Sequence, residues 1–246
     1  METNLATESK CNRGNPRGKV HGPKAVPRPI PKPPRFRSIK RAEKWCWKNF
    51  GLCCICSFQG GDLDVINPTI FQLTVLSNEF PEVADQFALF CIDDSITDAI
   101  AMVGELYSGL RMNAELYSDF YELMSELDYI EAMGDSPIGC NCIEYIATHE
   151  FAHEIHEWIN RECSIVEVNG DTGEVWEVFN KWLISQPLDK TISRCAGRNH
   201  QEYFAEAFAS HYHSSEPTER AEDAYRVVIS IFQQIRRQLR TEEVAA

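Results

Sequence analysis

Apolar residues recur at helical spacing over most of the chain beyond residue 97. A period of about 3.6 residues places such side chains on one face of a helix. The pattern therefore predicts helices over about 97–133, 140–161, 176–184, 200–213 and 217–239. Gly109 is a possible break in the first of these, and Pro187 ends the third.

Three short stretches between residues 62 and 92 have instead the pattern of strands. They are rich in β-branched and aromatic residues, which favour extended backbone, and turn residues follow the last one. The stretches are Asp62–Ile66, Ile70–Val75 and Phe87–Ile92. The sequence thus predicts a mainly helical α+β fold with a small N-terminal sheet. It contains no apolar run near 18 residues, so we expect no membrane span.

Residues 1–40 have the composition of a disordered tail. Seven of the twelve prolines lie here, with Lys and Arg between them. Proline restricts φ and lacks an N–H donor, so such a stretch favours extended chain without a core. We therefore expect a basic, Pro-rich tail over residues 1–40 and one ordered domain over residues 41–246.

The basic residues are concentrated in the N-terminal part of the chain and the acidic residues in the remainder. Residues 1–50 contain 13 Lys and Arg but only 3 Asp and Glu. Residues 51–246 contain 11 Lys and Arg and 34 Asp and Glu, and the whole chain has a net charge of −13. A basic tail can bind nucleic acid or another acidic partner. Alternatively it is a solvated linker, or it folds back on the acidic body. The lack of aromatic residues before Phe36 favours these alternatives.

The segment His149-Glu150-Phe151-Ala152-His153 contains the pattern H-E-x-x-H. Residues four apart on a helix differ by about 40° in rotation and about 6 Å in rise, so both imidazoles project from one face. Two such rings can bind one Zn²⁺, and Glu150 beside them can accept a proton from water. The alternative is a charged, solvated helix face. The apolar residues around the motif argue against it, because a buried helix needs partners for these polar groups.

A hydrolytic zinc site needs a third protein ligand. His156 shares the helix face, but it lies about 10.5 Å along the axis from His149, too far to converge on one ion. We therefore expect His156 to be a partly exposed polar residue. Glu202 and Glu206 are better candidates, because they lie four apart in an apolar segment where carboxylates need a metal or a ligating histidine. The alternative is an ordinary exposed glutamate pair.

These two motifs, together with the loop Ser193-Arg194-Cys195-Ala196, resemble the anthrax lethal-factor-type zincin metallopeptidases. Related domains occur in toxins and in phage-encoded proteins, and the resemblance covers about residues 140–240. It implies a zincin-like metallopeptidase domain with Zn²⁺ as cofactor. By the resemblance, His149, His153 and Glu202 are the zinc ligands, Glu150 is the general base, and Glu206 holds the ring of His149.

One residue departs from the family pattern. Seven residues before the ligand glutamate the family usually has a tyrosine that helps to stabilise the tetrahedral intermediate, and this chain has Cys195. A thiol is a weaker donor and could instead bind zinc as a thiolate. The expected function is a zinc-dependent endopeptidase, a hydrolase with a protein or peptide substrate. The alternative is a weak or inactive zincin with a structural or binding role, for example in a phage particle or its assembly.

The N-terminus lacks the apolar core of a signal peptide, so we expect a cytoplasmic protein. Association with a virion or export by a non-classical route are the alternatives. In that setting the ten cysteines are expected to be reduced thiols rather than a disulfide framework.

Overall fold

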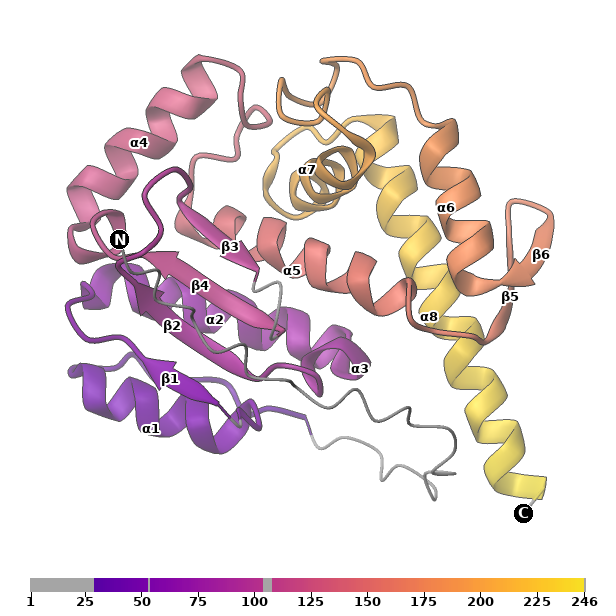
Figure 1. The fold of residues 1–246 in the computed structure, drawn as a ribbon, viewed down its shortest axis with the longest axis horizontal. Coiled ribbons are helices and arrows are strands. Elements are labelled where there is room, and N and C mark those ends of the chain that lie inside the picture. Colours follow the sequence, from indigo (N-terminus) through magenta and orange to yellow (C-terminus); the bar gives the residue numbers. More distant parts are fainter. Residues whose placement is uncertain (1–28, 53, 104–107, 246) are drawn as a thin grey trace, which may run out of the picture.

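A computed structural model of the chain describes residues 29–52, 54–103 and 108–245. It shows a mainly helical α+β fold, as predicted, with a four-stranded sheet beside a group of helices (Figure 1). The N-terminal half contains α1 (Ile39–Asn49), β1 (Ile55–Ser57), α2 (Leu63–Glu79), α3 (Pro81–Ala84), β2 (Leu89–Asp93), β3 (Ala101–Val103), β4 (Gly109–Asn113), the 3-10 helix η1 (Leu116–Ser118) and α4 (Phe120–Ala132). The C-terminal half contains α5 (Ile143–Ile159), β5 (Ile165–Val168), β6 (Asp171–Glu174), α6 (Val175–Ser185), α7 (His200–His213) and α8 (Glu219–Ala245).

The larger sheet has the strand order β1-β2-β4-β3. The first three strands are parallel, whereas β3 runs antiparallel to β4 at one edge. Strand β2 confirms the strand predicted at 87–92. Gly109 allows the close approach of β4 to β2, because its φ is +132° and a Cβ there would lie 2.0 Å from the Leu89 carbonyl oxygen.

The strands predicted at 62–66 and 70–75 are wrong, since both stretches belong to helix α2. Asp62 caps this helix by accepting the backbone N–H of Asp64 at 2.9 Å. The apolar residues that suggested strands, among them the β-branched Val65, Ile66 and Ile70, are instead buried at helical spacing. Packing of this face against α5 outweighs the residues' preference for extended backbone.

The helix predicted over 97–133 is wrong in its first half and correct in its second. Residues 101–103 and 109–113 form β3 and β4, with Ala101 opposite Met112. Residues 104–107 lie outside the described residues, and in the rest of this range Phe120–Ala132 is the only α-helix, capped by Asp119, which accepts the backbone N–H of Tyr121 at 2.8 Å. Strand β4 pairs with β2 over five residues. The backbone hydrogen bonds of this pairing join distant segments, so the apolar spacing of one segment does not predict them.

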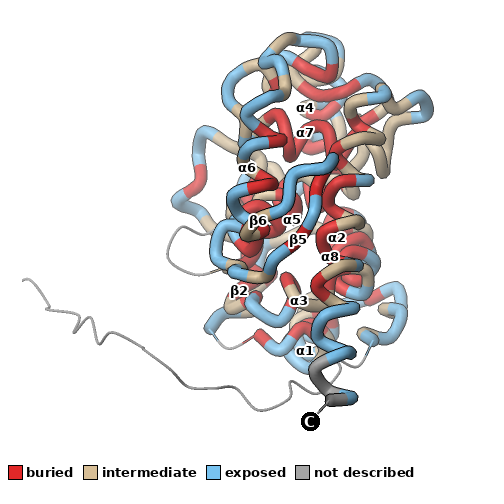
Figure 2. The backbone as a smooth tube through the Cα atoms, turned by 90° about the vertical axis from the view of Figure 1, so that its right-hand side faces the viewer, coloured by how far each residue is buried: buried red, intermediate tan, exposed pale blue. Residues whose placement is uncertain are grey.

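Helices α2, α5, α7 and α8 surround the main core. α5 packs on α2 and on α7, and α8 packs on α7. Figure 2 shows buried residues concentrated along α2, α5 and α7. The helices predicted at 140–161, 176–184, 200–213 and 217–239 are thus confirmed as α5 to α8. Cys46, Cys91 and Cys140 are buried free thiols, and burial raises the pKa of each.

Part of the predicted tail packs against the domain. Phe36 is buried, and its backbone N–H donates to Asn67 Oδ1 at 2.7 Å. Further out, the Ile30 N–H donates to Asn78 Oδ1 at 2.7 Å. Residues 1–28 of the tail lie outside the described residues. In the described ranges, no helix combines the length and apolar character that a membrane span requires.

Candidate metal centre

Helix α5 carries His149, Glu150 and His153 in the middle of the protein. Thirteen of its seventeen residues are buried, because α2 covers one side and α7 another. Buried alanines such as Ala147 and Ala152 leave room for the neighbouring helices to approach. The polar residues of the motif are therefore held on a rigid, enclosed element.

Helix α7 carries Glu202 and Glu206 and begins beside the motif. Asn199 caps it by accepting the backbone N–H of Glu202 at 2.9 Å. This cap sets the start of the helix, so that Glu202 lies in its first turn and Glu206 one turn further on. Side chains such as Ala205 and Ala209 are fully buried and small, which brings the two helices close together.

The structure brings His149, His153 and Glu202 together. The two Nε2 atoms lie 3.2 Å apart. Glu202 Oε2 lies 3.5 Å from His149 Nε2, and Glu202 Oε1 lies 3.7 Å from His153 Nε2. Tetrahedral ligands about 2.1 Å from zinc would be about 3.4 Å apart, so this donor set fits the ion. The three side chains are 14%, 21% and 28% exposed, which leaves the cluster accessible to solvent.

Glu206 lies behind the ligand set and orients one of its rings. Its Oε1 is 3.0 Å from His149 Nδ1 and also accepts the Tyr145 hydroxyl at 2.7 Å. His149 turns Nδ1 toward this carboxylate, in a charge contact rather than an aligned hydrogen bond, and presents Nε2 to His153 and Glu202. Glu206 is 2% exposed, and its Oε2 has no hydrogen-bond partner among the described residues. A buried carboxylate of this kind increases the attraction of the site for a cation.

The pKa values of the two histidines shift in opposite directions. Burial alone would lower the pKa of His149, but the hydrogen bond to Glu202 and the adjacent carboxylate of Glu206 outweigh burial and raise that pKa well above its ordinary value. Burial, followed by the neighbouring His149 charge, lowers the pKa of His153. The hydrogen bond from His149 lowers the pKa of Glu202. A metal ion would replace the proton on His149, because zinc binds the neutral ring.

Glu150 lies beside the ligands and is 8% exposed. Its carboxylate lies near the backbone of Val103, in the edge strand β3, which packs on α5. Burial raises the pKa of Glu150 to about 7, with the charge of His149 opposing this shift and that of Glu202 adding to it. A carboxyl group with a pKa near neutrality can both accept and return a proton.

Two other predicted residues do not join the ligand set. Cys195 is half-buried and is not part of the cluster that could hold a metal. Burial and the Glu206 charge raise the pKa of Cys195 to about 11, which favours the neutral thiol. The expectation of a partly exposed His156 is wrong, because the residue is only 5% exposed and its ring packs against Phe179 and Phe204. The adjacent α6 and α7 cover this end of α5.

Sequence reasoning missed three supporting residues. Tyr145 lies one helical turn before His149, a spacing that could have identified it as a partner for the same site. Val103 contributes only through its backbone, which lies near Glu150, so its residue type carries no signal. Glu154, next to the motif, accepts the Ser108 hydroxyl at 2.6 Å and the backbone N–H of Gly109, and thereby fastens the start of β4 to α5.

Comparison with known proteins adds nothing to these observations. The chain matches no protein-family model, no curated protein and no solved structure.

Proposed function

We propose that this protein is a zinc-dependent endopeptidase. The convergence of His149, His153 and Glu202, with Glu150 buried beside them, carries the proposal. Two imidazoles and one carboxylate form a donor set that suits zinc and leaves one coordination position open. The resemblance of these residues to the lethal-factor-type motifs points to the same chemistry.

Each residue of the candidate site has a separate role in the proposed hydrolysis. Zinc held by the three ligands would act as a Lewis acid and lower the pKa of water toward about 7. Glu150 takes the proton of the attacking water and returns it to the leaving amine. Glu150 lies near the backbone of Val103, and Glu206 keeps the ring of His149 in position.

Strand β3 supports a peptide as the substrate. It lies at the edge of the sheet next to α5, and within the described ranges its only strand partner is β4. Figure 1 shows β3 beside β4, at the edge of the sheet that faces α5 and α7. An extended peptide can pair with such an edge through its own backbone groups. Because β3 packs on α5, where Glu150 lies near the backbone of Val103, a peptide paired with β3 would lie near the general base.

Zinc-dependent cleavage of a mixed peptide library tests the proposal. The purified chain loaded with zinc should cleave internal peptide bonds. EDTA should abolish the cleavage, and added zinc should restore it, with the products identified by mass spectrometry. Zinc bound at one ion per chain without any cleavage would instead support the inactive zincin, and a chain that binds no zinc would contradict both.

Replacing Cys195 by Tyr should raise kcat about tenfold or more with little change in KM. The resemblance places a tyrosine hydroxyl near the developing oxyanion, and such a donor acts mainly in the transition state. Steady-state kinetics on one peptide measure the change. Cys163→Tyr is the matched control, because Cys163 is an exposed cysteine in another loop. No gain at Cys195, or an equal gain at Cys163, would show that Cys195 does not occupy the tyrosine position.

A further inference from the structure

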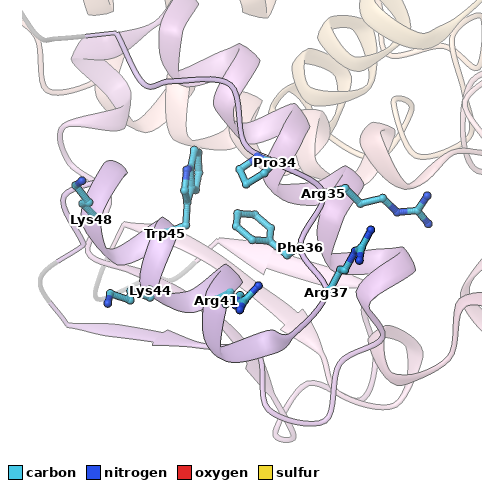
Figure 3. A pocket seen from close by; sticks show the side chains of 8 residues that line it. All are labelled: Pro34, Arg35, Phe36, Arg37, Arg41, Lys44, Trp45 and Lys48. Carbon is cyan, nitrogen blue, oxygen red and sulfur yellow. The ribbon is translucent and has the colours of Figure 1, made fainter.

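A pocket of about 500 Å³ lies at the N-terminal end of the described chain, away from the candidate metal centre. It is formed by the segment before α1 and by α1 itself, which packs on β1 at the edge of the sheet opposite β3. Its lining residues are Pro34, Arg35, Phe36, Arg37, Arg41, Lys44, Trp45 and Lys48. Figure 3 shows the apolar side chains in the middle and the basic side chains around them.

The basic side chains around this pocket have few partners in the protein. Arg35 pairs with Asp64 at 2.8 Å. The other four cations have no carboxylate partner among the described residues. Glu43, the acidic residue of the same helix, forms no ion pair with them, and its carboxylate turns toward Phe58, whose backbone N–H it accepts at 2.8 Å. The rim is therefore a concentrated positive surface on an otherwise acidic protein.

The positions of these cations favour a chain-like anion. Arg41, Lys44 and Lys48 are exposed and lie three and four residues apart, so they follow one face of α1 over about 10 Å. The basic character also continues into the preceding sequence. From Lys10 to Arg41 the chain contains eleven Lys and Arg residues and no Asp or Glu. Such an array can neutralise several successive phosphates.

The floor of the pocket distinguishes a nucleic acid from a merely acidic ligand. The indole of Trp45 is half-buried, with its ring centroid 5.8 Å from that of Phe36 and 5.8 Å from that of Phe50. An aromatic floor with a cationic rim suits a flat base whose phosphates lie outside. A duplex keeps its bases stacked inside and cannot offer one to the pocket. An acidic peptide has no group that requires the indole.

We propose that this basic-aromatic pocket binds single-stranded nucleic acid, with one base against Trp45 and neighbouring phosphates on Arg37, Arg41, Lys44 and Lys48. Sequence reasoning did not find this surface, because the aromatic residues that complete it follow the basic tail. Only the fold of the 34–37 segment against α1 combines the two. The site is independent of the proposed peptidase, because it lies at the opposite edge of the sheet.

Fluorescence anisotropy with a labelled oligo(dT) of about 12 nucleotides tests this proposal on the whole chain at about 50 mM salt. We expect micromolar binding, weakened about tenfold or more in the triple variant Arg41→Gln, Lys44→Gln, Lys48→Gln. The slope of log K against log salt should fall by about two in that variant. The matched control removes three exposed charges from α8 by Arg226→Gln, Arg237→Gln, Arg240→Gln, and should change affinity less than about threefold.

Trp45→Leu separates stacking from charge. It should weaken oligo(dT) binding about tenfold while leaving the salt slope unchanged, with folding verified by circular dichroism. Glu150→Gln should bind as the wild type does, so failure of the peptidase proposal would not affect this result. Absence of binding at low salt, or equal losses in the two triple variants, would overturn the proposal. Equal competition by duplex DNA or by polyglutamate would overturn it as well, because either ligand would show that only charge is recognised.

Discussion

Replacing Glu150 by Gln is expected to reduce the rate of peptide hydrolysis by about 10²–10⁴-fold while zinc remains bound. Glutamine keeps the size of the side chain, so the packing of α5 is maintained. It cannot accept a proton, and the attacking water then loses its base. The three ligand side chains are not altered, so metal content should stay at one zinc per chain.

The measurement combines kinetics and metal analysis on the same preparations. Glu157→Gln is the matched control, because Glu157 is an exposed glutamate on the same helix and should retain full activity. A Glu150→Gln variant that still hydrolyses peptides at the wild-type rate would refute the role of this residue as base. Loss of zinc together with activity would instead show that Glu150 helps to hold the metal.

Replacing Glu202 by Ala is expected to remove most of the bound zinc. It leaves only the two histidines of α5, and two ligands bind zinc far more weakly than three. The zinc content after dialysis should fall from about one equivalent to below about 0.1. Gln201→Ala is the matched control, because Gln201 is an exposed neighbour in the same helical turn and should retain the ion. Full zinc occupancy in the Glu202 variant would exclude this carboxylate as a ligand.

Thermal unfolding gives the same prediction a second readout. A ligand present at 100 times its Kd stabilises the folded state by about 2.7 kcal/mol, so EDTA should lower the Tm of the wild type. The Glu202→Ala variant should show little further change with EDTA, since it has little zinc to lose. An equal response to EDTA in both proteins would place the stabilising metal elsewhere in the chain.

The prediction of the site depended on short-range spacing. His149 and His153 are four residues apart on a helix with a strong apolar pattern, so their common orientation follows from helical geometry. The same reasoning placed Glu202 and Glu206 on one face of a second helix. The sequence offered no comparable signal for Val103, whose backbone lies near Glu150. For His156, spacing excluded it as a ligand but could not reveal the aromatic rings that cover it.

The fold was predictable where local pattern and tertiary packing agree. The helices α5 to α8 combine helical spacing with terminal signals such as Asn199 and Pro187, and the structure has them at the expected places. In α2 the two conflict. Its β-branched residues favour a strand, yet burial of one face against α5 makes it a helix. For β3 and β4 the opposite holds. Their apolar residues have helical spacing, yet β4 pairs with β2 and with β3, so both segments are strands.

The sequence by itself thus determined the C-terminal helices, the mainly helical α+β class, and the two motif helices with their candidate ligands. Only the tertiary structure decided which segments between 62 and 113 are strands, and that His149, His153 and Glu202 meet within 3.7 Å. The physical reason is the range of the interactions. Helical periodicity and caps act between residues three or four apart, whereas strand pairing and the approach of α7 to α5 join residues tens of positions apart.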